Sequence, residues 1–205
     1  VFSHKPFLVL ADYLTRCGIA VLRADKRGIG GSTGNYRQAT TEDFASDALA
    51  GVQYLRSRNE IDLKRVGLIG HSDGGRVAVI VAAQSPSLAF IVMMAGPGID
   101  GYDNLVLQDV MTAKERGATE EEAALIRSWV KRFYRIALEE KDDVTAKGKM
   151  QDLYAGRSPE EEHAFRLLKG WSLEIDNALS PYMRYELAFD PRPFLEKVKC
   201  PVLAV

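Results

Sequence analysis

Apolar residues follow two patterns along this chain: short continuous runs, and longer stretches with helical spacing. The continuous runs predict buried strands at residues 19–24, 65–70, 89–95 and 201–205. The helical spacing predicts helices at residues 6–17, 40–58 and 73–84, the second of them capped by Thr40 and Asp43. Strands that alternate with helices indicate an α/β fold with a mostly parallel sheet and helices on both of its faces.

The alternation stops between residues 100 and 190, where no strand pattern is present. Thr119 to Glu122 reads as a capping box, and so does Ser158 to Glu161, each opening a helix. We therefore expect residues 1–99 to form the first part of an α/β core, 100–190 a helical insertion, and 191–205 a return to the sheet. An insertion after a strand end lies over the site edge of the sheet, so it is a candidate lid; the alternative is a packing appendage.

The most informative motif is the turn Gly-His-Ser-Asp-Gly-Gly at residues 70–75, which lies between a predicted strand and a predicted helix. A G-x-S-x-G pattern in this context is typical of a nucleophile elbow. We expect Ser72 to have strained backbone angles, and Gly70 and Gly74 to lack side chains that would collide. The alternative is a glycine-rich turn with an idle serine.

A glycine-rich loop, residues 25–32, follows the first predicted strand. A phosphate-binding loop would need the spacing G-x-G-x-x-G or a following Gly-Lys-Ser/Thr, and neither is present. We favour a structural loop beside the catalytic turn, in which Asp25 and Arg27 bond to local backbone and to each other.

Composition narrows the possible functions. A net charge of −1 gives no reason to expect a nucleic acid or an anionic membrane surface as partner. No apolar run is long enough to span a membrane. With three histidines and two cysteines, Cys17 and Cys200, a metal cluster is not expected, and we expect no cofactor.

The two ends of the sequence look interrupted. The chain begins at Val1 without a start methionine, and its last apolar run, residues 199–205, stops without a turn. We expect a fragment of a longer protein, for which compartment and oligomeric state stay open.

Asp25-x-Arg27-Gly28-x-Gly30-x-Ser32, followed some forty residues later by the serine turn, resembles the α/β-hydrolase superfamily. It is similar to bacterial esterases of the EstD type and to the serine aminopeptidase-like group. The resemblance implies an α/β-hydrolase fold with a helical lid insertion. It makes Ser72 the nucleophile, the backbone N–H of Asp73 one oxyanion donor, and Gly70, His71, Gly74 and Gly75 the rest of the elbow. It also implies that the second donor precedes the first helix, and that the acid and the histidine base follow residue 205.

The three histidines of the chain are not expected to act as the base. His71 adjoins the serine on a turn and is expected to point elsewhere, and His163 is expected on a solvated helix face among glutamates. His4 lies where the loop of the second oxyanion donor would end, so a substrate contact is an alternative role for it. Asp100 and Asp103 follow a predicted strand, where some α/β-hydrolases keep their acid, but a loop leading into the insertion is the simpler explanation.

The resulting hypothesis is a serine hydrolase that cleaves carboxylic esters through an acyl-enzyme. Its substrate would be a small-molecule ester or a short peptide. Trp171, Tyr182 and Tyr185 are candidates for an acyl pocket, and core packing explains them equally well. One alternative is a serine aminopeptidase-like enzyme, in which Glu160 to Glu162 bind an amine, although a helix N-terminus also favours acids. The other is a binding module that has lost the chemistry. Taken as 205 residues, the chain is expected to be nearly inactive without an acid and a base.

Overall fold

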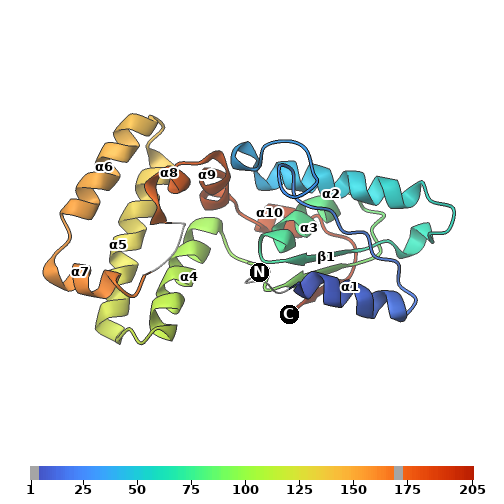
Figure 1. Ribbon diagram of the computed structural model, residues 1–205, viewed down its shortest axis with the longest axis horizontal. Helices are drawn as coiled ribbons and strands as arrows, with labels where there is room; N and C mark the ends of the chain where they lie inside the picture. Colours follow the sequence, from blue (N-terminus) through green and yellow to red (C-terminus); the bar gives the residue numbers. More distant parts are fainter. Residues whose placement is uncertain (1–4, 169–172) are drawn as a thin grey trace.

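The computed structural model describes residues 5–168 and 173–205. Two bodies lie side by side in Figure 1. Residues 5–100 and 189–205 form the α/β body, and the described residues of 101–188 form the helical body.

The α/β body contains a parallel sheet of β1 (Leu68–His71), β2 (Ile91–Met94) and β3 (Val202–Ala204), in that order. Leu68 is paired with Ile91, which is paired in turn with Val202. Three of the four predicted strands are therefore confirmed as parallel neighbours, each shorter than its apolar run.

The predicted strand at residues 19–24 is wrong. These residues have no regular secondary structure, and within the described chain their only backbone hydrogen bond outside helices and strands joins Ile19 to α1. Ile19 and Leu22 are 51% and 44% exposed. An apolar, β-branched composition favours extended backbone, but a strand also needs a partner edge within hydrogen-bonding reach. Here Leu22 lies beside Gly51 of α2 (Thr41–Arg56) instead.

Helices cover both faces of the sheet. They are α1 (Pro6–Arg16), α2, α3 (Asp73–Gln84) and α10 (Arg192–Leu195), with short 3₁₀ helices η1 (Tyr36–Gln38) and η2 (Leu63–Arg65). In Figure 1, α2, α3 and α10 lie on one side of the sheet and α1 on the other. Buried aliphatic residues of α3 pack between α2 and the sheet, among them Val79, Ile80 and Val81. The prediction of helices on both faces of the sheet is confirmed, with α2, α3 and α10 on one face and α1 on the other.

The helical body consists of α4 (Gly101–Glu115), α5 (Glu120–Glu139), α6 (Asp143–Ala155), α7 (Pro159–Phe165), α8 (Ile175–Ala178) and α9 (Pro181–Ala188). No strand occurs in its described residues. Thr119 and Ser158 form the predicted capping boxes with Glu122 and Glu161. These reciprocal bonds satisfy amides that the first helical turn leaves without a partner.

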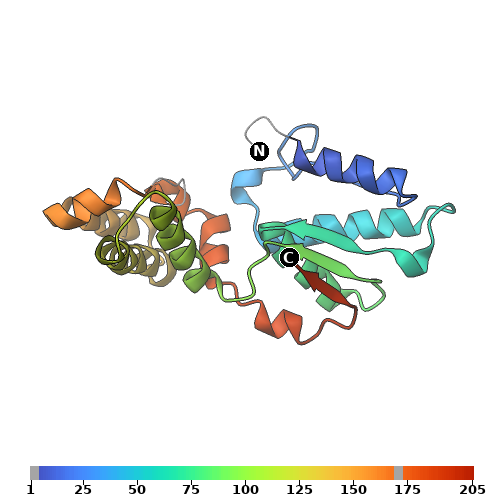
Figure 2. The same ribbon diagram turned by 90° about the horizontal axis from the view of Figure 1, so that it is seen from below.

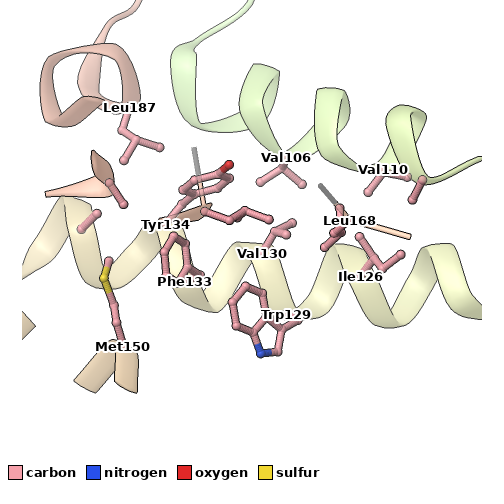
Figure 3. Packing of buried hydrophobic residues seen from close by; sticks show 14 of the residues in the cluster. Val106, Val110, Ile126, Trp129, Val130, Phe133, Tyr134, Met150, Leu168 and Leu187 are labelled. Atoms are coloured by element: carbon pink, nitrogen blue, oxygen red, sulfur yellow. The ribbon is translucent and has the colours of Figure 1, made fainter. Parts of the chain in front are cut away.

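A hydrophobic core of its own fills the helical body (Figure 3). Trp129, Phe133 and Tyr134 of α5 are 1% exposed or less, and they pack between α4, α6 and α9. Helix α9 contributes to both cores, because Met183 and Leu187 join this cluster while Tyr185 packs on the core of the α/β body.

The two crossings between the bodies lie next to each other. Gly101, at the start of α4, donates its N–H to the carbonyl of Phe189 at 2.8 Å. A Cβ on Gly101 would overlap the carbonyl oxygen of Glu186. The chain therefore enters and leaves the helical body through one narrow neck, which Figure 2 shows from below.

Candidate active site

Ser72 occupies the turn between β1 and α3, with φ 54° and ψ −119°. A positive φ is uncommon for a residue with a Cβ and costs about 1–3 kcal/mol. The turn is held by the N–H of Ser72, which donates to Met94 of β2 at 2.9 Å, and by that of Gly75, which donates to Ser72 at 2.8 Å. Ser72 is exposed at the carboxyl end of β1. The predicted strain at this serine is confirmed.

The glycines of the turn differ in how much room a side chain would have. A Cβ on Gly70 would overlap the carbonyl group of Gly74, and one on Gly75 would stand 2.8 Å from the Cα of Gly96. A Cβ on Gly74 would meet no atom within 4 Å. The expectation that a side chain at Gly74 would collide is therefore wrong, because its Cα faces open space and only its carbonyl lies against Gly70.

The N-terminus of α3 faces the serine without a side-chain cap. Ser72 is its N-cap residue and accepts no side-chain hydrogen bond from the first turn. The N–H of Asp73 points from the first helical position, where an amide has no intrahelical partner. Such an amide, at the positive end of a helix, can stabilise negative charge that develops on an oxygen beside it.

The histidines lie away from the serine hydroxyl as far as they are described. His71 packs on the ring of Phe7 of α1, with ring centroids 5.6 Å apart. His163 lies 3.5 Å from Glu122 in the helical body. His4 falls outside the described residues. The structure thus brings no described histidine to Ser72.

Asp100 and Asp103 have a structural role. Asp100 is the N-cap of α4, and its Oδ1 accepts the N–H of Asp103 at 2.9 Å. Asp100 thus precedes the helical body as expected, whereas Asp103 lies in the first turn of α4 rather than in a loop.

The glycine-rich loop is closed by local bonds. Ser32 Oγ donates to the carbonyl of Asp25 at 2.8 Å, and the Asp25 carboxylate accepts the N–H of Gly31 at 3.3 Å. Arg27 does not pair with Asp25 as expected: its guanidinium bonds to Asp47 at 2.7 and 2.8 Å and to Asp43 at 3.0 Å. Both acids lie on α2, so Arg27 fastens the loop to that helix.

A chain of polar side chains runs from this loop to the helical body. Lys26 Nζ lies 2.9 Å from Asp73 Oδ2, and Thr41 Oγ1 lies 3.0 Å from Asp73 Oδ1. The same Thr41 oxygen lies 2.6 Å from Glu186 Oε1, and Glu186 Oε2 forms an ion pair with Arg76. We call these five residues, Lys26, Thr41, Asp73, Arg76 and Glu186, the polar chain.

Arg76 and Glu186 are the buried end of the polar chain, each with a side chain 4% exposed. Burial lowers the pKa of Arg76, while the charge of Asp73 opposes that shift. Nε and Nη2 of Arg76 are buried without a hydrogen-bond partner among the described residues. A charge taken out of water at such cost needs its counter-ion, so removing Glu186 alone would leave an uncompensated buried cation.

Sequence reasoning missed the polar chain. Its signals were an arginine within the apolar stretch of α3 and a glutamate between Tyr185 and Leu187. Both are charged residues at positions that helical spacing would place against a core, and a buried charge implies a partner.

The aromatic pocket candidates lie in two places. Tyr182 of α9 has its ring centroid 6.3 Å from those of Tyr36 and Phe44, and desolvation together with the neighbouring charge and hydrogen bond of Asp73 raises its pKa. Tyr185 faces Phe189 at 5.8 Å, and burial, reinforced by Glu42, raises its pKa. Trp171 lies outside the described residues. Both tyrosines feel the charge of Asp73, the residue after Ser72, and Tyr182 also forms a side-chain hydrogen bond with it.

The described residues contain no group of His, Cys, Asp and Glu side chains that could hold a metal ion. Across the same part of the chain, no helix combines the length and apolarity needed to cross a membrane.

Comparison with known proteins assigns the family. Residues 5–160 match the family described as serine aminopeptidase, S33. Two uncharacterized proteins from two strains of Mycobacterium tuberculosis are each 35% identical to the chain over 83 residues. That stretch is 40% of this chain and 28% of each relative, so the chain spans less than a third of the relatives' length in the match. Because the family match spans most of the sequence and includes the Ser72 turn, the chain belongs to the serine aminopeptidase S33 family of α/β-hydrolases.

Proposed function

We propose that Ser72 is the nucleophile of a serine hydrolase that cleaves carboxylic esters of small molecules. The observation that carries this is the backbone of Ser72: a strained serine at the end of a parallel strand, one residue before an uncapped helix. Strain of this kind persists where the surrounding structure imposes it, and it gathers at functional sites. Membership of a serine hydrolase family supports the same role.

In the proposed reaction, Ser72 Oγ bonds to the ester carbonyl carbon while its proton passes to a base. The tetrahedral oxyanion lies at the N–H of Asp73, and the alcohol leaves with the proton. Water then attacks the acyl-enzyme and gives a proton to the base, which passes it to Ser72 Oγ as the bond to the acyl carbon breaks and the carboxylic acid leaves. The family resemblance implies that the base is a histidine oriented by an acid.

The helical body is proposed as the lid, and residues 1–99, 100–190 and 191–205 as first core part, lid insertion and return to the core. Two observations support this: the body is joined to the sheet through the Gly101 and Phe189 neck, and its helix α9 interacts with Asp73 through Tyr182. The acyl pocket would be formed by Tyr182, Tyr185 and Trp171. A cover over the site excludes water and sets the shape of the substrate that fits.

An aminopeptidase is the second candidate, because the family is described by that activity. The proposed amine-binding glutamates are, however, engaged locally. Glu161 completes the capping box with Ser158, Glu160 accepts the Ser158 hydroxyl at 2.8 Å, and Glu162 binds Arg157 at 2.7 Å. An ester therefore agrees better with the contacts of this chain than an amine-bearing peptide does.

The deciding experiment is labelling of the full-length protein with a fluorophosphonate, followed by hydrolysis assays. Labelling at Ser72 that is absent in Ser72→Ala is expected for an enzyme, and lack of labelling would favour a binding module. Faster cleavage of acetate and butyrate p-nitrophenyl esters than of aminoacyl-anilides is expected for the esterase. The opposite order would favour the aminopeptidase.

A further inference from the structure

The polar chain contains two ion pairs that share a single hydroxyl. Lys26 neutralises Asp73 at 2.9 Å on the side of the glycine-rich loop, and Arg76 neutralises Glu186 inside the molecule. Between the two carboxylates lies Thr41 Oγ1, 3.0 Å from Asp73 and 2.6 Å from Glu186. Three helices, α2, α3 and α9, therefore meet at this oxygen.

One hydroxyl carries one proton, so Thr41 donates to one carboxylate at a time. The shorter distance is that to Glu186. Thr41 is completely buried, whereas the Asp73 side chain is 14% exposed and is also contacted by Lys26 and Tyr182. Thr41 therefore adds a buried link between the Asp73 side chain and Glu186 of α9.

We propose that Thr41 and Glu186 are positioning residues that fix Asp73, and with it the oxyanion-binding N–H, against helix α9 of the helical body. This inference rests on the proposed function, since it assigns the Asp73 N–H a role in the reaction. It makes α9 part of the active-site support: Glu186 reaches Arg76 one turn along α3 from Ser72, and Thr41 reaches the residue next to Ser72.

The position of Glu186 in the fold supports this role. Its backbone carbonyl lies against Gly101 so closely that a Cβ on that glycine would overlap it. Glu186 thus lies at the neck where the chain enters and leaves the helical body. A displacement of the helical body would move Glu186, and Thr41 would transmit the movement to Asp73. A small misplacement of a catalytic group can reduce the rate by about 100-fold.

The test is Thr41→Val in the full-length protein, with Thr41→Ser as the rescue. Valine keeps the shape of threonine and removes the hydroxyl. We expect kcat on a p-nitrophenyl ester to fall about 10- to 100-fold with KM changed less than threefold, and serine to restore kcat. Amide hydrogen exchange across Pro181–Ala188 should rise in the valine variant and return to the wild-type rate in the serine variant.

Thr145→Val is the matched control. Thr145 donates to Asp142 at 2.6 Å in the helical body, so this variant makes the same chemical change at an exposed site. It should leave kcat and the exchange of α9 unchanged. Unchanged kcat and unchanged exchange in Thr41→Val would overturn the inference. A fall in kcat that serine does not restore would also overturn it, because the loss would come from packing.

The two proposals fail in different ways. If the wild-type protein hydrolyses no ester and Ser72 is not labelled, the proposed function and the role in positioning the amide both fall. The exchange of α9 would then still decide whether Thr41 ties α9 to α3. If the wild type is active and Thr41→Val is equally active, only the positioning role falls.

Discussion

The hydroxyl of Tyr134 donates a hydrogen bond of 2.6 Å to Asp109 Oδ2 in the core of the helical body. Tyr134 is completely buried and Asp109 is 9% exposed. Burial raises the pKa of Asp109 to about 6, against the opposing effect of the Tyr134 bond. The folded helical body is therefore more stable when the Asp109 carboxyl group is protonated than when it is ionised.

This relationship predicts that the contribution of Asp109 to stability decreases as pH rises. Between about pH 4, the ordinary pKa of Asp, and about pH 6, Asp109 binds more protons in the folded protein than in the unfolded chain, so its contribution to the free energy of unfolding falls across this window. Asp109→Asn keeps the acceptor and removes the ionisation. At pH 8 it should be more stable than wild type by about 2–3 kcal/mol, since each pKa unit is about 1.4 kcal/mol.

Urea unfolding of both proteins at pH 4.5, 6 and 8 measures this difference. The gap between variant and wild type should widen as pH rises. A gap that is constant across the three values would show that Asp109 does not titrate in the folded protein.

Gly70→Ala should disrupt the Ser72 turn, because its Cβ would overlap the Gly74 carbonyl. We expect a loss of about 1–3 kcal/mol in stability and a fall of about 100-fold or more in ester hydrolysis. Gly74→Ala is the matched control, because its Cβ meets open space and alanine favours helix by up to about 1 kcal/mol. Thermal unfolding and kcat/KM of both variants check this; equal effects at the two positions would contradict the geometry.

Ser72→Ala should leave the fold intact and reduce hydrolysis of p-nitrophenyl acetate by several orders of magnitude. Only oxyanion and binding effects would remain, about 10³–10⁴-fold over the uncatalysed reaction. Steady-state rates of the full-length protein, with circular dichroism as the folding control, decide the question. A variant that kept most of the wild-type rate would remove Ser72 from the mechanism.

Tyr182→Ala should change which acyl chain is preferred. Tyr182 lies with Tyr36 and Phe44 beside Asp73, so its removal enlarges the space next to the nucleophile. The ratio of kcat/KM for octanoate over acetate esters should rise at least fivefold, with the acetate rate changed less. Tyr185→Ala, near Phe189, tests the second pocket candidate by the same ratio. A ratio that both variants leave unchanged would assign these tyrosines to packing alone.

Sequence reasoning succeeded where the determining interactions are local. The capping boxes at Thr40, Thr119 and Ser158 each involve a partner three residues away, and all are present. The strained Ser72 follows from a motif of a few residues in the right context. Local patterns carry this information because the interacting groups are neighbours in the sequence.

It failed where the structure depends on distant partners. Thr41 and Glu186 are 145 positions apart, and no local pattern records that they meet. Residues 19–24 have a strand-like composition, yet whether they pair depends on an edge elsewhere in the fold. Gly70 and Gly74 differ in what surrounds the Cα: a side chain at Gly70 would overlap backbone atoms, and one at Gly74 would not. The sequence alone does not contain this difference.

The neck at Gly101 and Phe189 makes the helical body separable as a module. Its two connections are adjacent, and it carries its own hydrophobic core, so exchanging it for another helical unit changes little in the sheet. Evolution or an engineer can therefore replace most of the helical body while leaving the Ser72 turn in place. The exceptions lie on α9: Glu186, which neutralises Arg76, Tyr182, which interacts with Asp73, and Tyr185, which packs on the core of the α/β body.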